Sequence, residues 1–163
     1  MRILIFTEGT ILMHKTTIGH TREEISQQVK DNEKTIHDYF AYVPIGNAVH
    51  KLTKWRNQGA EITYLTSRTK PNEITDIENV LKRHHFPDGQ LLFRQKGEEY
   101  NNVAERILPD ILIEDDCECI GGIDEMAITH VKPEIKKKIK SIPVKEFGGI
   151  DHLPDKISEL IYS

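Results

Sequence analysis

Three acidic residues, Glu114, Asp115 and Asp116, directly follow the apolar run 111–113. Such a run is typical of a buried strand, so the acids are expected at a strand's carboxyl end. Gathering carboxylates there is unfavourable unless a cation or a basic side chain compensates their charge. Carboxylate oxygens suit Mg²⁺, which usually keeps several waters and takes one or two protein carboxylates. The pattern indicates either a Mg²⁺ site or a solvated acidic loop that caps the next helix.

Two hydroxyl residues, Thr66 and Ser67, follow a second apolar run at 62–65. A hydroxyl beside free backbone amides at the end of a buried parallel strand is suited to hold a phosphate oxygen. The same pair is also compatible with an ordinary structural turn. The interpretation of this pair as a phosphate site therefore depends on the polar residues that follow the other strands.

A third apolar run, 3–6, ends abruptly in the polar segment 7–10, which contains Glu8. In open α/β sheets, ligands bind in the crevice outside the carboxyl ends of the strands. The polar segment 7–10 therefore lies where folds of this class place their chemistry.

The elements that position these residues alternate along the chain. The apolar runs are 3–6, 62–65, 91–93, 111–113 and 142–144, and the segments with helical spacing are 44–58, a helix from Pro71, 98–108, 133–139 and 154–161. Alternating strands and helices predict βαβ units and a parallel sheet.

One segment does not fit this alternation. More than 30 residues separate the first strand from the helix at 44–58, and they include Thr21 and Glu24 at the spacing of a capping box. A crossover between parallel strands needs only one helix. The segment, approximately 12–43, is therefore predicted to be a small helical insertion over the carboxyl edge of the sheet.

The order and spacing of these strand ends resemble the motifs of the haloacid dehalogenase (HAD) superfamily. In that family the first strand leads into Asp-x-Asp-Gly-Thr, the second ends in Thr or Ser, and the fourth ends in paired acids that bind Mg²⁺. The resemblance makes Glu8 the acid/base residue and a metal ligand, and makes Thr66 and Ser67 phosphate-binding. It makes Asp115 and Asp116 metal ligands, with a slip of one residue to Glu114 as an alternative.

The third motif of the family is a Lys or Arg before the fourth strand. Lys96 matches it, and Arg94 is a competing candidate. The resemblance implies that Lys96 binds phosphate and offsets the negative charge of phosphate and carboxylates during catalysis.

The departure from the family is at Phe6, which stands where the family has its nucleophilic Asp. Family phosphatases form an aspartyl phosphate, which divides a difficult displacement into two easier steps. A phenyl ring has no lone pair with which to attack, and the lost Asp also removes a metal ligand. We therefore expect weak Mg²⁺ binding and no covalent route. A water activated directly by Mg²⁺ would be a different mechanism.

The resemblance implies a single domain, 1–163, with a three-layer α/β sandwich. Its Rossmann-like parallel sheet has five strands in the order 5-4-1-2-3, counted along the chain, and the insertion is a small cap. The implied function is a divergent phosphohydrolase acting on small phosphate esters. The alternatives are a non-catalytic binding or regulatory protein that senses a phosphorylated metabolite or nucleotide, and a purely structural role.

Composition limits the remaining function classes. The net charge of −4 argues against general nucleic-acid binding, which needs an excess of Lys and Arg. No apolar run approaches the roughly 20 residues that span a bilayer, and the first apolar run is too short for a secretory signal. Cys117 and Cys119 are too close in sequence to staple the fold, so reduced thiols are expected. These features predict a cytoplasmic protein whose partner is a small phosphorylated molecule.

Overall fold

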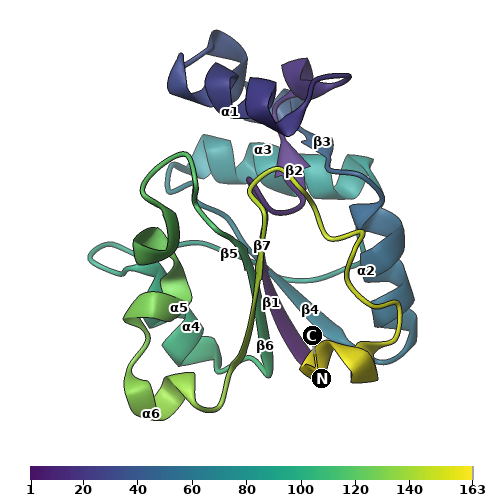
Figure 1. Ribbon diagram of the computed structural model, residues 1–163, viewed down its shortest axis with the longest axis vertical. Helices are drawn as coiled ribbons and strands as arrows, with labels where there is room; N and C mark the ends of the chain where they lie inside the picture. The colour runs from purple at the N-terminus through teal and green to yellow at the C-terminus, as the bar shows by residue number, and fades with distance from the viewer. Residues whose placement is uncertain (163) are drawn as a thin grey trace.

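A five-stranded parallel sheet lies at the centre of the computed structural model, which describes residues 1–162 (Figure 1). Its strands are β1 (Arg2–Phe6), β4 (Glu61–Leu65), β5 (Leu91–Leu92), β6 (Ile111–Asp115) and β7 (Lys140–Val144). They lie in the order β5-β4-β1-β6-β7, and every neighbouring pair is parallel. The strand numbers differ from those expected because β2 and β3 form a separate pair. Counted within the large sheet, the neighbours are the predicted ones.

Helices cover both faces of this sheet, because successive side chains of a buried strand point to opposite faces. Ile3 and Ile5 of β1 pack in the cluster that contains Trp55 and Ile77. Leu4 packs in the opposite cluster, with residues of α4 and α5. The helices are α2 (Ala48–Asn57) and α3 (Pro71–Arg83) on the first face, and α4 (Tyr100–Ile107), α5 (Ala127–His130) and α6 (Pro133–Lys136) on the second. The molecule therefore has three layers.

Two helices begin later than their sequence pattern predicts. The helix expected from Pro44 begins at Ala48, because Pro44 belongs to a strand and Gly46 has a φ of +52°. That left-handed backbone turns the chain before α2 and favours glycine. The helix expected from Glu98 begins at Tyr100, after Glu99 forms a capping box with Asn102. In both cases a turn or a cap residue, rather than the apolar spacing, determines the first helical residue.

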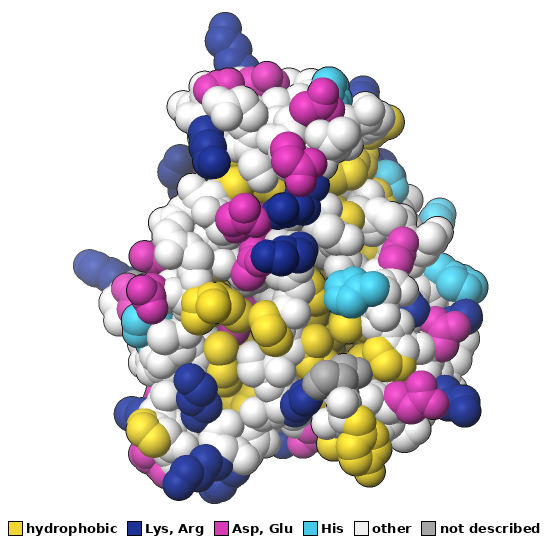
Figure 2. All heavy atoms as spheres, viewed as in Figure 1, with side chains coloured by type: hydrophobic (Ala, Val, Ile, Leu, Met, Phe, Trp, Pro, Cys, Tyr) yellow, Lys and Arg dark blue, Asp and Glu magenta, His cyan; other side chains and the backbone are white. Residues whose placement is uncertain are grey.

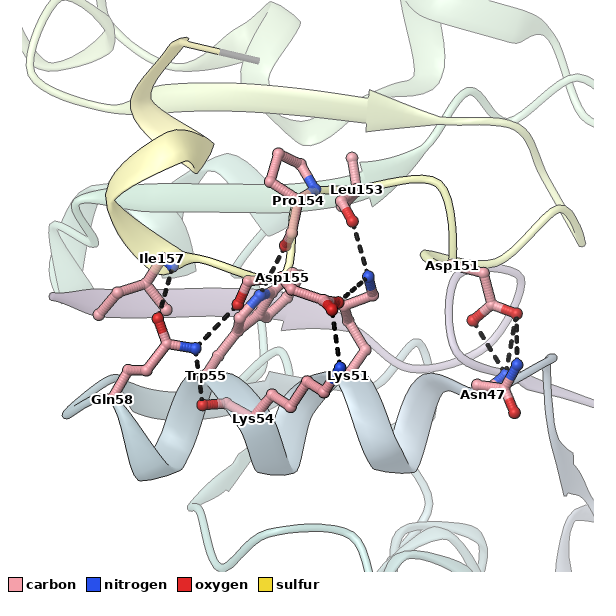
Figure 3. Close-up of polar contacts among 10 residues, drawn as sticks. All are labelled: Asn47, Lys51, Lys54, Trp55, Gln58, Asp151, Leu153, Pro154, Asp155 and Ile157. Carbon is pink, nitrogen blue, oxygen red and sulfur yellow. Dashed lines mark hydrogen bonds and ion pairs between the residues drawn. The ribbon is translucent and has the colours of Figure 1, made fainter.

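The end of the chain also differs from the prediction. The expected helix at 154–161 is a 3₁₀ helix, η5 (Ile157–Tyr162), and the helix expected at 133–139 ends at Lys136. Figure 3 shows the segment before η5 lying along α2. Trp55 Nε1 donates to the carbonyl of Pro154 at 2.9 Å, and Lys51 Nζ donates to that of Leu153 at 2.7 Å. Side chains of α2 thus satisfy backbone carbonyls that a helix would have used internally.

The insertion lies over the carboxyl ends of the strands (Figure 1). Strands β2 (Leu12–Met13) and β3 (Val43–Pro44) pair antiparallel at its base. It also contains α1 (Arg22–Lys30) and the 3₁₀ helices η1 (Lys15–Thr17), η2 (Lys34–His37) and η3 (Tyr39–Ala41). Thr21 and Glu24 form the predicted capping box at the start of α1. The insertion contacts α3, where an Arg83 guanidinium N–H donates a hydrogen bond to the carbonyl of Phe40 at 2.5 Å.

Polar and apolar side chains are distributed unevenly over the surface. Figure 2 shows charged side chains of both signs over the insertion, and hydrophobic side chains gathered lower on the same face. Ile120 and Ile123 are among the exposed large hydrophobic residues, with 67% and 69% of their surface accessible. Within residues 1–162, no helix has the length and apolar character needed to cross a bilayer.

Candidate functional site

A cavity of about 640 Å³ lies at the carboxyl edge of the sheet, between the strand ends and the insertion. Phe6 and Glu8 line it from the end of β1, and Asp115 lines it from the end of β6. Val29 of α1 and Ile36 of η2 line it from the insertion. This is the position in which the sequence predicts a site, and the volume is in the range of small-molecule binding pockets.

The Glu8 carboxylate is held by donors from the first and second strand ends. The Thr66 hydroxyl donates to Glu8 Oε1 at 2.7 Å, and the Ser67 backbone N–H donates to Oε2 at 3.2 Å. The Thr7 hydroxyl also donates to Oε2. Thr66 and Ser67 are the residues predicted to hold phosphate. In this structure, an internal carboxylate uses the donors that a phosphate oxygen would use.

Arg68 connects this group to the insertion. Its Nε lies 3.2 Å from Glu8 Oε1, and one Nη donates to Ser67 Oγ at 2.7 Å. The other Nη donates to the hydroxyl of Tyr39, and the guanidinium lies 4.5 Å from the centre of the Tyr39 ring. A cation over an aromatic face is favourable, and more so where it is partly desolvated. Arg68 therefore positions η3 relative to the end of β4.

Arg94 is the second cationic group of the cavity. It follows β5, lies 4.2 Å from the centre of the Tyr100 ring, and pairs with Glu99 at 3.1 Å. The Nε of Arg94 is buried without a hydrogen-bond partner, and the buried Nε of Arg68 has only its ion pair with Glu8. The side chains of Arg94 and Arg68 are 28% and 26% exposed. Buried donors are usually satisfied, so the Arg94 Nε is an unused donor next to the cavity.

The opposite end of the cavity is acidic. Glu114 accepts the backbone N–H groups of Ala127 and Ile128 at the start of α5, at 2.7 and 3.0 Å. Burial raises the pKa of Glu114 to about 7 in spite of these two donors. Burial and repulsion from Glu146 together raise the pKa of Asp115 to about 6. For Glu114, burial outweighs both the two backbone donors and the charge of Lys136, which lower its pKa.

The loop after β1 approaches Asp115 closely. Thr10 Oγ1 donates to Asp115 Oδ2 at 3.0 Å, and the Cys117 backbone N–H donates to Oδ1 at 3.1 Å. Gly9 has a φ of +81°, and a Cβ added there would lie 2.7 Å from Asp115 Oδ2. Both the backbone angle and the contact require glycine at this position. Asp115 is thus fixed against the loop that carries Glu8.

The structure separates Asp116 and Lys96 from the other predicted site residues. Asp116 lines a different cavity, where its Oδ2 lies 2.9 Å from Lys145 Nζ and its Oδ1 accepts the N–H of Glu146 at 3.1 Å. These contacts outweigh burial and hold the pKa of Asp116 below its usual value. Lys96 is exposed and does not line the cavity, because the loop after β5 directs Arg94 inward instead. Glu114 and Arg94, the two alternatives to these residues, both line the cavity.

The described residues do not form a fitting site for Mg²⁺. No group of three or more His, Cys, Asp or Glu residues within 1–162 is arranged to hold a metal ion. Asp115 and Glu8 have oxygens engaged by protein donors, and Asp116 pairs with Lys145. A metal site needs deprotonated ligands that converge on one point, so the arrangement of this donor set does not support the predicted metal centre.

The end of β1 carries a phenyl ring at the position where the resemblance expects an Asp. Phe6 lines the cavity and packs edge-on against Tyr100, with their ring centres 5.2 Å apart. Cys117 is free and also lines the cavity. However, burial and the nearby carboxylates raise the pKa of its thiol far above the usual value. A protonated thiol is a poor nucleophile.

The sequence reasoning did not assign roles to Arg68, Tyr100 or Glu146. Arg68 directly follows the predicted phosphate-binding pair, so its position after a strand end was a usable signal. Tyr100 lies two residues into the helical pattern that begins at Glu98, and nothing in that pattern distinguishes it from a core residue. Glu146 follows β7, and the rule that ligands bind at strand ends covers this position too.

The fold is similar to that of known phosphatases. No protein-family model matches the sequence, and no curated protein matches it. The class C acid phosphatase from Bacillus anthracis with tungstate bound matches with a TM-score of 0.55 and 16% identity, over 91% of this chain and 68% of that chain. A second structure of a class C acid phosphatase from the same organism gives a TM-score of 0.54 and 16% identity, over 99% of this chain and 77% of that chain. The chain therefore shares the fold of these phosphatases, and at this identity the likeness is one of fold alone.

Proposed function

We propose that this protein binds a small phosphorylated molecule in the cavity at the carboxyl edge of the sheet and does not hydrolyse it through a phospho-enzyme. We further propose that it descends from a HAD-type phosphohydrolase of small phosphate esters. Binding in this proposal is by the chain's own arginines and does not depend on Mg²⁺.

The unpartnered Nε of Arg94, with Arg68 as a second cation lining the same cavity, is the observation that carries this proposal. A guanidinium presents five N–H donors in a planar fork that matches phosphate geometry. Leaving a buried donor without an acceptor is unfavourable, and a bound anion relieves this cost. The two arginines follow neighbouring strands, β4 and β5, so they lie at one end of the cavity.

The absence of a nucleophile at the first strand end supports binding rather than turnover. Family chemistry requires a carboxylate at position 6, and the side chain there is a phenyl ring packed against Tyr100. The one carboxylate that follows β1 into the cavity is Glu8, which is held by three donors and Arg68. Glu8 is therefore a poor candidate for in-line attack.

We expect the Arg94→Met variant to bind inorganic phosphate roughly tenfold more weakly than the wild type, because a hydrogen bond to a charged group contributes about 1.5–3 kcal/mol. Methionine retains the aliphatic contact with Tyr100 and removes the charge. Isothermal titration calorimetry with EDTA at constant ionic strength gives the dissociation constants.

The matched control is Arg106→Met, which removes an exposed arginine of α4 that pairs with Glu98 outside the cavity. This variant should bind phosphate as the wild type does. If both variants bind phosphate equally weakly, the loss of affinity is due to the change in net charge and not to the position of Arg94. A wild-type protein that binds no phosphate at all would refute the proposed function.

The Glu8→Ala variant is expected to bind inorganic phosphate about tenfold more tightly than the wild type. The Glu8 carboxylate occupies the Thr66 hydroxyl and the Ser67 N–H, and its removal frees both donors for a phosphate oxygen. It also removes a negative charge from beside Arg68. The same calorimetric titration measures the gain, and unchanged or weaker binding would show that the bound anion does not use these donors.

A further inference from the structure

We infer that the ligand is a phosphomonoester with a large apolar or aromatic body and a single anionic group. This inference rests on the proposed function and adds the chemical class of the ligand. It comes from the parts of the cavity wall that the anion-binding end does not use.

The cavity is much larger than a phosphate group requires. Its volume of about 640 Å³ suits a ligand of drug-like size, and pockets of this kind bury most of the ligand's surface. The arginines account for one end only. The remaining volume must be filled by the part of the ligand that carries the phosphate, or by water.

The walls beside the arginines are apolar and partly aromatic. Phe6 and Tyr100 form the wall next to Arg94. The insertion contributes further apolar side chains, and others come from the segments after β6 and β7: Leu12, Met13, Val29, Ile36 and Tyr42 from the insertion, and Ile120, Ala127 and Phe147 from those segments. Water in such surroundings finds few hydrogen-bond partners, and an apolar or aromatic group that displaces it is favoured. An aromatic body can also stack on, or pack edge-on against, the rings of Phe6 and Tyr100.

The acidic end of the cavity disfavours a second anionic group. Glu114, Asp115 and Glu146 line the side formed by β6 and β7, whereas Arg68 and Arg94 line the side formed by β4 and β5. A ligand with phosphates at both ends would place one of them against these carboxyl groups. Like charges at close range are unfavourable, particularly where burial reduces the effective dielectric constant.

Calorimetric titration of the full chain with three compounds tests the inference. The probes are inorganic phosphate, 1-naphthyl phosphate and fructose 1,6-bisphosphate, with EDTA at constant ionic strength. We expect 1-naphthyl phosphate to bind at least tenfold more tightly than either of the other two, because only its body can bury apolar surface. 1-Naphthol, which lacks the phosphate, should bind at least tenfold more weakly than its ester.

The outcomes separate this inference from the proposed function. If inorganic phosphate and 1-naphthyl phosphate bind equally well, the proposed anion site is supported, and the inference that the ligand has an apolar body is refuted. If fructose 1,6-bisphosphate binds most tightly, the single-anion requirement is wrong. If no phosphate compound binds, the proposed function itself fails.

Two variants of the insertion provide the structural control. Ile36 lines the cavity and is half-buried, whereas Ile18 is 63% exposed and does not line it. Ile36→Asn should reduce the preference for 1-naphthyl phosphate over inorganic phosphate at least threefold, and Ile18→Asn should leave it unchanged. Because the measured quantity is a ratio of two ligands on one protein, partial unfolding does not mimic the result. If the ratio of the two affinities is unchanged in Ile36→Asn, the insertion does not contact the body of the ligand.

Discussion

The Phe6→Asp variant is expected to hydrolyse a small phosphate ester roughly 100-fold faster than the wild type, because one positioned proton-transfer or nucleophilic group typically contributes 10²–10⁴-fold. Phe6 ends β1 and lines the cavity together with Glu8 and Asp115. A carboxylate at this place restores an oxygen nucleophile facing the anion-binding end. The resemblance assigns the transfer of a proton to the leaving group to Glu8, two residues later.

The same substitution adds a carboxylate to a cavity that Glu8 and Asp115 already line, and where the described residues lack a metal-binding group. The gain should therefore depend on Mg²⁺, and chelation with EDTA should abolish it. Release of nitrophenol from p-nitrophenyl phosphate measures the rate. The loss of the Phe6–Tyr100 contact will lower stability, so the melting temperature is recorded alongside.

Phe6→Asn is the matched control, because it has the shape of Asp without the nucleophilic charge. An equal gain in Phe6→Asn would attribute hydrolysis to the opened space and a water molecule rather than to a carboxylate. A wild-type rate as high as that of Phe6→Asp would show that the phenyl ring does not disable the chain. A folded but inactive Phe6→Asp would contradict the proposed descent from a phosphohydrolase.

The parts of the structure that follow from local sequence were predictable. The apolar runs of the central strands are buried on both faces, which is the pattern typical of strands in a parallel sheet. The capping box of Thr21 and Glu24 involves residues three apart, so its geometry is determined locally. The neighbour order of the strands came from the resemblance to a known fold, since apolar runs alone do not specify it.

The directions of charged side chains were not predictable, because they depend on partners far away in sequence. Asp116 is drawn toward Lys145, which lies on the loop after β7. The Glu8 carboxylate accepts hydrogen bonds from residues at the end of β4, and no sequence pattern relates the loop after β1 to that strand end. Arg94 and Lys96 are near neighbours in one loop, and the contacts with Tyr100 and Glu99 place Arg94 inward.

The structure of the C-terminal segment was also not predictable from local sequence. Its apolar spacing is compatible with a helix, and the structure instead has a chain fastened to α2 through Trp55 and Lys51 (Figure 3). Carbonyls that accept hydrogen bonds from side chains do not need the bonds of a helix. Tertiary contacts therefore override the local preference in this segment.

The stability of the metal-free protein is expected to contain a pH-dependent contribution from Glu114 that disappears between about pH 5 and pH 8. Burial raises the pKa of Glu114 from 4.5 to about 7, so the folded state binds the proton more tightly than the unfolded state. The resulting stability is present below the unfolded pKa and is lost as the pH rises through the folded pKa. A shift of this size corresponds to about 3 kcal/mol. Asp115 is raised in the same direction, to about 6, and titrates together with Glu114.

Other groups titrate in this range, so the test uses the difference between two proteins. Burial lowers the pKa of His14, which acts in the opposite direction because a neutral buried imidazole loses stability as the pH falls. Glu114→Gln removes the titrating carboxyl and keeps one acceptor oxygen for the start of α5. Urea unfolding with EDTA should show this variant gaining about 2 kcal/mol relative to the wild type between pH 5 and pH 8. Glu61→Gln, at an exposed position at the start of β4, should show no such pH-dependent difference. A wild-type protein and Glu114→Gln variant with parallel pH profiles would mean that the Glu114 carboxyl is compensated in the folded protein, and the acidic end of the cavity would then be able to accept a second anion.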